Sequence, residues 1–187
     1  MGITKFNKDF IHYSSFGHKV KATYSKTYLN LLGFRKEASV INIEKFKESI
    51  SHMNRFVYCL FEKTKPRILF VNLDEASNQL TLLCALRSIQ PVLVENWSSG
   101  TFTNVVSKNK ITAVFLLSSK KNCFVIEEAN KLNIPIISFV DTDSTFNKVT
   151  FPLWLNDNSL QLDHRLTSVL SNIIIKATLN KHALPYL

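Results

Sequence analysis

The chain has 187 residues, enough for one domain with a buried core that needs no disulfide bonds. Its three cysteines, Cys59, Cys84 and Cys123, show no C-x-x-C spacing, which argues against a zinc site and predicts buried free thiols in a reducing compartment. The longest apolar runs fall far below the roughly 20 residues that span a bilayer, so we expect a soluble protein with no membrane partner.

The net charge of +9 is concentrated in the first third of the chain. Residues 1–67 hold 13 Lys and Arg against 5 Asp and Glu, whereas residues 68–187 hold 10 against 9. The basic residues are interleaved with Tyr, Phe and His, a mixture suited to phosphate contacts and to stacking on bases. This pattern favours a nucleic-acid-binding surface. A merely solubilising basic end is the alternative that the composition leaves open.

The sequence predicts a basic N-terminal segment at residues 1–36 and a single α/β domain at residues 37–187. The segment contains a short helix near residues 3–11 and then extended loop. The domain begins with a first strand at residues 39–43. Further strands are predicted at residues 68–71, 92–94, 112–117 and 134–140, with a short edge segment at residues 150–154.

Helices are predicted between these strands from apolar residues at helical spacing. One helix begins near Asn42 or Glu44, and its inward stripe is Phe46, Ile50, Met53, Val57 and Leu60. A second is capped by Asp74 and extends to residue 86, and its inward set is Ala76, Leu80, Leu83 and Leu86. A third is capped by Ser118 or Ser119, and a last helix opens at Asn158.

Residues 127–145 show the pattern of a β-α-β unit most clearly. Asn133 stands where a left-handed helix terminator is needed, and Pro135 cannot continue the helix. The following strand is apolar with almost no alternation, which is typical of a parallel strand covered on both faces. The working edge of such a sheet lies beyond the carboxyl ends of its strands, and residues 141–145 mark that edge.

Motifs for catalysis are weak. With only four glycines, the chain has no phosphate-binding glycine loop and therefore no predicted nucleotide cofactor. Asp141 and Asp143 resemble the D-x-D-x-T motif of magnesium-dependent phosphohydrolases, in which the first carboxylate attacks phosphorus and the second acts as acid and base. That motif needs several later strands, yet only residues 146–187 remain. The phosphohydrolase is kept as an alternative, beside a partner-binding α/β module that does not contact RNA.

Several short stretches occur in the order known from one protein family. They are H-x-x-x-F-G-H at residues 12–18, G-F-R at 33–35 with V-I-N-I-E-K at 40–45, R-I-L-F-V at 67–71, W-S-S-G-T-F-T-N at 97–104, E-A-N-K-L-N-I-P at 128–135 with D-T-D at 141–143, and N-D-N at 156–158. Together they resemble the S-two family of small-ribosomal-subunit proteins, from about residue 10 to residue 180.

The resemblance implies a flavodoxin-like three-layer α/β/α fold with a five-stranded, mainly parallel sheet. The helical hairpin that bacterial members carry between the third and fourth strands is absent, because residues 103–110 bridge that gap. It also implies a structural constituent of the small ribosomal subunit in translation, not an enzyme, that binds ribosomal RNA and neighbouring ribosomal proteins without a metal, a cofactor or a small-molecule substrate.

The predicted RNA contacts come partly from the resemblance and partly from the basic segment. They are His18, Lys19, Lys21, Lys26, Arg35, Lys36, Trp97, Thr103 and Asn104. For Trp97, packing against the edge of the sheet is an equally weighted alternative.

The family resemblance also suggests a compartment. The match begins so near Met1 that it leaves no room for a cleaved transit peptide. Richness in Asn, Lys, Ile and Phe, together with the missing hairpin, resembles a mitochondrial ribosomal protein. Synthesis inside the organelle would reconcile these two observations.

Overall fold

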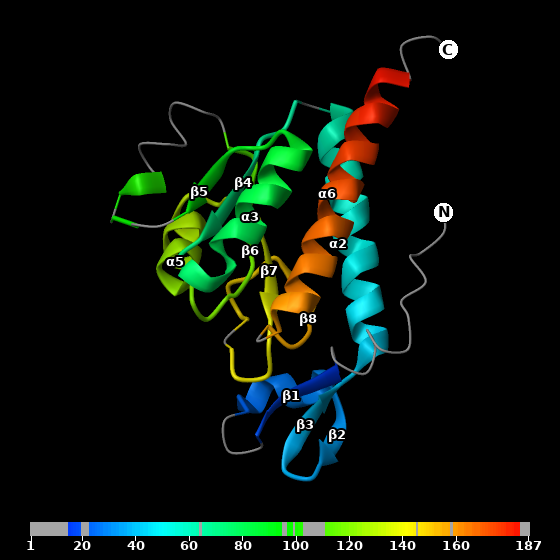
Figure 1. Cartoon of the computed structure of the whole chain (residues 1–187), viewed down its shortest axis with the longest axis vertical. Coiled ribbons are helices and arrows are strands. Elements are labelled where there is room, and N and C mark those ends of the chain that lie inside the picture. The colour runs from blue at the N-terminus through cyan, green and yellow to red at the C-terminus, as the bar shows by residue number, and fades with distance from the viewer. Residues whose placement is uncertain are drawn as a thin grey trace.

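The computed structural model describes residues 15–19, 23–63, 65–94, 97–98, 100–102, 111–144, 146–157 and 159–183. Its centre is a parallel sheet of five strands between layers of helices (Figure 1). The strands are β4 (Ile68–Asn72), β5 (Val92–Val94), β6 (Ala113–Leu116), β7 (Ile136–Val140) and β8 (Phe151–Trp154). Their spatial order is β5-β4-β6-β7-β8, which is the flavodoxin-like order.

Helices cover both faces of this sheet. The helices α2 (Ile43–Lys63), α3 (Glu75–Ser88) and α6 (Leu160–Ala183) contribute to one core cluster, which contains Phe70, Phe115 and Phe139 from the sheet. The helix α5 (Cys123–Lys131) contributes to the cluster on the other face. The predicted three-layer fold is therefore confirmed, and β7 is buried at every position as its apolar run predicts.

The first predicted strand belongs to a different sheet. Residues near 39–43 form β3 (Ala38–Ile41), which pairs antiparallel with β1 (Phe16–Lys19) and β2 (Leu31–Arg35). We call these three strands, with the 3₁₀ helix η2 (Ser25–Asn30), the N-terminal sheet. The central sheet reaches five strands through β8, which the sequence predicts only as an edge segment. The burial of β3 alternates along the strand, as expected for a sheet with one covered face, and this pattern is the reason why β3 does not belong to the central sheet, which is covered on both faces.

The helix α2 follows its prediction. The side-chain oxygen of Asn42 accepts a hydrogen bond from the Glu44 N–H at 2.9 Å and caps the first turn. Phe46, Met53 and Val57 are fully buried, so the predicted stripe does face the core.

The inward face of α3 differs from its prediction. Leu83 and Leu86 are 60% and 64% exposed, whereas small residues face the protein: Ser77, Thr81, Cys84, Ala85 and Ser88. The hydroxyls of Thr81 and Ser88 donate to carbonyls one turn earlier in the same helix, so their burial leaves no donor unpaired. Counting apolar residues cannot identify a buried helix face whose hydroxyl groups donate hydrogen bonds within the same helix.

The cysteines agree only in part with the prediction of buried thiols. Cys84 is buried, and burial raises the pKa of its thiol to about 12. Cys59 and Cys123 are exposed, so the prediction is wrong for both.

The end of α3 is strained. Ile89 adopts the left-handed conformation with φ 54° and ψ 44°, and its side chain is 90% exposed. A β-branched residue is disfavoured there, whereas glycine is not. Ile89→Gly should therefore raise the free energy of unfolding by about 1–2 kcal/mol in urea denaturation. Asn133, which the sequence predicts as a left-handed helix terminator, also has a φ of 54°; asparagine tolerates this region, so Asn133→Gly should change the stability by only about a few tenths of a kcal/mol. Equal effects at the two positions would contradict this account.

Candidate nucleic-acid interface

The N-terminal sheet lies against the carboxyl ends of the central strands, beside β7 and β8 (Figure 1). Thr142, the second residue after β7, makes the polar contacts. Its carbonyl accepts hydrogen bonds from the Tyr24 N–H at 2.8 Å and the Thr27 hydroxyl at 3.2 Å. Its hydroxyl oxygen accepts from the His18 N–H at 2.9 Å and lies 3.2 Å from the Ser39 hydroxyl. One residue thus joins several parts of the N-terminal sheet to the central domain.

The contact at Thr142 is close enough to require a glycine opposite it. A Cβ atom added to Gly17 would lie 2.6 Å from Thr142 Cγ2 and 2.7 Å from Ser39 Oγ. The glycine of the H-x-x-x-F-G-H stretch therefore allows β1 to approach the D-T-D stretch of residues 141–143.

His18 faces the two carboxylates that flank Thr142. Its Nδ1 lies 3.2 Å from Asp141 Oδ2, and its Nε2 lies 3.5 Å from Asp143 Oδ2. Lys120 Nζ also donates to Asp143 Oδ2, at 2.5 Å. The imidazole of His18 thus contacts the central domain through both carboxylates.

Burial dominates the electrostatics of this edge. Asp141 is fully buried, and desolvation raises the pKa of its carboxyl to about 6 although the Thr142 N–H donates to it. Burial likewise raises the pKa of Asp157, whose carboxylate accepts a hydrogen bond from Ser118 at 2.6 Å. Burial also raises the pKa of Asp163 to about 7.

This geometry argues against the phosphohydrolase alternative. A nucleophilic carboxylate must reach phosphorus, yet Asp141 is buried and its two oxygens accept hydrogen bonds from the N–H groups of Thr142 and Asp157. The part of the chain that the structure describes contains no group of three or more His, Cys, Asp or Glu side chains placed to hold a metal ion.

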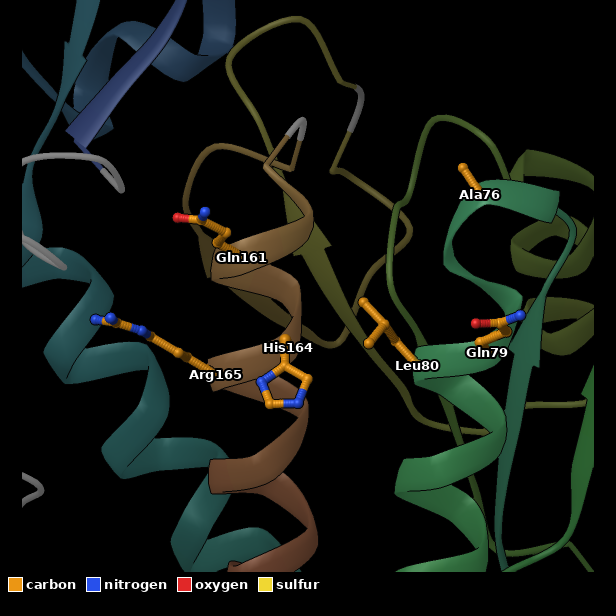
Figure 2. Close-up of a pocket in the computed structure, with 6 residues that line it drawn as sticks. All are labelled: Ala76, Gln79, Leu80, Gln161, His164 and Arg165. Carbon is orange, nitrogen blue, oxygen red and sulfur yellow. The ribbon is translucent and has the colours of Figure 1, made fainter.

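A hollow of about 660 Å³ lies between the first turns of α3 and α6, but it does not gather polar groups. Gln161 and Arg165 project from α6 away from α3, whereas Leu80 points into the gap (Figure 2). Ala76, Gln79 and His164 complete the lining. Binding sites for small molecules place several polar groups toward one ligand, and this hollow does not.

Four of the predicted RNA contacts are exposed cations of the N-terminal sheet. They are Lys19, Lys26, Arg35 and Lys36. Within the described residues from 15 to 41, Glu37 is the single acidic side chain. None of the four cations forms an ion pair among the residues that the structure describes. Their charge is therefore available to an outside anion.

Of the remaining predicted contacts, the structure describes only His18, which faces Asp141 and Asp143, and Trp97, so neither adds to this group of cations. Lys21, Thr103 and Asn104 lie outside the described residues, as does the short helix predicted at residues 3–11. Trp97 packs with Phe102 in the cluster on the α5 face, with ring centroids 5.2 Å apart. Its indole N–H donates to Glu128 at 3.1 Å, and the same carboxylate accepts from the Phe102 N–H.

The sequence prediction notes aromatic residues among the cations but does not single out two features of the site. Thr142 appears in the sequence only as the middle of a polar strand end, and its partners lie more than a hundred residues away. Tyr28 and Phe34 stand half exposed on the N-terminal sheet, and no local pattern marks them as surface residues.

None of the helices that the structure describes is long and apolar enough to cross a membrane.

Comparisons with known proteins point to one family. Residues 12–112 and 106–177 match the family model described as ribosomal protein S2. The two matched segments meet at residues 106–112, close to residues 103–110, where the sequence predicts that a helical hairpin is missing.

Curated bacterial relatives agree with this match. The small ribosomal subunit protein uS2 of Borrelia hermsii is 22% identical over 210 residues, covering 87% of this chain and 82% of the relative. That of Borreliella burgdorferi is 22% identical, covering 87% and 80%. That of Renibacterium salmoninarum is 28% identical over 85 residues, covering 45% and 29%.

Proposed function

Because the chain belongs to the ribosomal protein S2 family, we propose that its structural role in the small ribosomal subunit is carried out by binding ribosomal RNA through the N-terminal sheet. The observation that carries the proposal is the group of exposed cations Lys19, Lys26, Arg35 and Lys36, which form no ion pair with any acidic side chain that the structure describes. Contacts between cations and phosphates supply most of the affinity of sequence-independent RNA binding. The role is structural and not catalytic.

The placement of the N-terminal sheet supports this role. In open α/β sheets, ligands bind beyond the carboxyl ends of the strands. Here strands β7 and β8 end against the N-terminal sheet, whose four cations are exposed. The N-terminal sheet, with its exposed cations, thus occupies the position at which related folds bind small ligands.

Neighbouring ribosomal proteins and a mitochondrial compartment are further parts of the proposal. The names of the relatives place them in small ribosomal subunits, where RNA and other proteins surround each component. The mitochondrial location is supported by the Asn, Lys, Ile and Phe richness and by the short bridge at residues 103–110. Finding the gene in nuclear DNA with an N-terminal extension would contradict synthesis inside the organelle.

Removing three cations tests the proposed surface. Lys19→Gln, Lys26→Gln and Arg35→Gln together should weaken binding to small-subunit ribosomal RNA. The slope of log K against log salt concentration should flatten by about one for each lost phosphate contact. Filter binding at several salt concentrations measures both quantities, and sedimentation in a gradient measures incorporation into the subunit.

The matched control removes three cations from other exposed positions. Lys47→Gln, Lys131→Gln and Lys176→Gln lie on α2, α5 and α6 and change the net charge equally. If both triple variants lose the same affinity, only total charge matters and the N-terminal sheet is not the interface. A wild-type chain that neither binds this RNA nor sediments with the subunit would overturn the ribosomal role itself.

A further inference from the structure

We propose that Tyr28 and Phe34 form a stacking platform for unpaired bases of the RNA, while Lys26, Arg35 and Lys36 contact the phosphates on either side. This inference rests on the proposed function, and it adds which chemical part of the RNA is recognised. The platform is defined as the two rings of Tyr28 and Phe34.

The two rings lie together on the surface. Their centroids are 5.6 Å apart and their planes meet at 72°, so the edge of one ring meets the face of the other. Tyr28 is 45% exposed and Phe34 is 47% exposed. An edge-to-face pair leaves the outer faces of both rings uncovered by each other, and a planar base can stack on such a face.

Buried neighbours hold both rings in place. Thr27 is 1% exposed, and its hydroxyl donates to the Tyr24 carbonyl at 2.6 Å and also to Thr142. With three residues per turn in η2, anchoring Thr27 turns its neighbour Tyr28 outward. Phe34 pairs with Ser39, which is fully buried and whose hydroxyl donates to the His18 carbonyl at 2.8 Å.

This anchoring has an energetic consequence. Both aromatic residues sit next to positions tied to Thr142, so the platform is ordered before any ligand arrives. Binding then costs less conformational entropy than ordering a free loop would.

The charges around the platform favour RNA over an apolar protein surface. Lys26 lies two residues before Tyr28, and Arg35 follows Phe34 on β2, so the side chains of Phe34 and Arg35 project from opposite faces of the strand; both cations are exposed. Leu29 and Leu32 are also exposed, at 87% and 68%, and widen the apolar surface. Single-stranded nucleic acid offers planar bases and regularly spaced phosphates together, which this mixture of rings and cations matches.

The turn between β2 and β3 is strained. Lys36 and Glu37 have φ angles of 48° and 66°, both in the left-handed region, where a two-residue hairpin turn favours Asn-Gly. Such conformational costs concentrate at functional positions. The tip of the hairpin that carries Phe34 presents Lys36 beside the acidic side chain of Glu37.

Replacing the rings with leucine tests the platform, because leucine keeps an apolar side chain and removes the stacking face. The variants are Tyr28→Leu, Phe34→Leu and their combination, and the probe is a labelled oligouridine, alone and paired with oligoadenine. The combined variant should bind the single strand about tenfold or more weakly, with an unchanged salt slope and unchanged duplex binding.

Two controls make the comparison specific. Tyr28→Phe keeps the ring and should bind like the wild type. Phe124→Leu removes an aromatic side chain that is 69% exposed on α5, and it should also have no effect. Thermal unfolding should show unchanged stability for the single leucine variants, because the replaced rings are half exposed.

The outcomes separate this inference from the proposed function. If the leucine variants bind oligouridine like the wild type, the platform is overturned, while the charge-removal result still decides whether the N-terminal sheet binds RNA. If they bind oligouridine normally but fail to enter the subunit, the rings contact a protein and the inference is overturned. If the wild type binds no RNA at all, both proposals fail.

Discussion

Gly17→Ala is expected to lower the free energy of unfolding by about 2–3 kcal/mol. The added Cβ would lie 2.6 Å from Thr142 Cγ2 and 2.7 Å from both Thr142 Oγ1 and Ser39 Oγ, well inside contact distance. Both neighbours are buried and hydrogen-bonded, so neither can move aside without losing a contact. Strand β1 must therefore separate from the central domain. Urea denaturation gives the stability, and amide hydrogen exchange should accelerate in residues 16–41.

A double-mutant cycle tests the cause. Thr142→Ser removes Cγ2, the atom nearest the new Cβ, and keeps the hydroxyl that accepts from the His18 N–H. Gly17→Ala should therefore cost less in the Thr142→Ser background than in the wild type. Lys19→Ala, at an exposed position of the same strand, should change the stability by less than about 0.5 kcal/mol. An equal cost of Gly17→Ala in both backgrounds would show that the close approach to Thr142 is not responsible.

Asp163→Asn is expected to stabilise the chain by roughly 4 kcal/mol at pH 8 and to have little effect at pH 4. Asp163 is 5% exposed, and its Oδ1 has no hydrogen-bond partner among the described residues. Burial, with a smaller contribution from the nearby carboxylate of Asp157, raises its pKa from 3.8 to about 7. Asparagine keeps the shape without the charge. Urea denaturation at several pH values measures the difference.

The sign follows from proton binding. Between pH 4 and pH 7 the folded chain keeps the proton of Asp163, whereas the unfolded chain releases it. The contribution of this group to stability is therefore full below about pH 4, declines as the pH rises to 7, and stays low above that. Glu62→Gln, at an exposed position of α2, is the matched control and should show no such dependence. A gain from Asp163→Asn that is equal at pH 4 and pH 8 would contradict the charge-based explanation.

The sequence predicts the fold well where the signal is local. The unbroken apolar run of β7, the stripe of α2 and the terminator Asn133 each have a local cause, and each is found as predicted. The prediction of the inward face of α3 is wrong, because small residues, several of them with hydroxyl groups, pack there and leave Leu83 and Leu86 exposed. Such a face depends on the helix opposite, and that information is not local.

The candidate site is predictable only in part. The excess of Lys and Arg marks Lys19, Lys26, Arg35 and Lys36, and the structure shows all four exposed. Their role as RNA contacts stays a prediction. The contacts of His18 with Asp141 and Asp143 could not be predicted, because they join segments more than a hundred residues apart. The domain boundary predicted between residues 36 and 37 stays a prediction; in the structure these two residues form the turn between β2 and β3 of the N-terminal sheet.

The dependence of the N-terminal sheet on Thr142 also sets an order for folding during synthesis. Synthesis begins at the N-terminus, so the strands of the N-terminal sheet emerge first. Thr142, which anchors this sheet, is synthesised only after about three-quarters of the chain has been made. Contacts between such distant segments form late, because a long loop must close first. The cations therefore reach their final arrangement only when the α/β body is nearly complete. A truncated product that ends before residue 142 would still carry the cations of the N-terminal sheet, but it would lack the contacts with Thr142 that hold this sheet against the central domain.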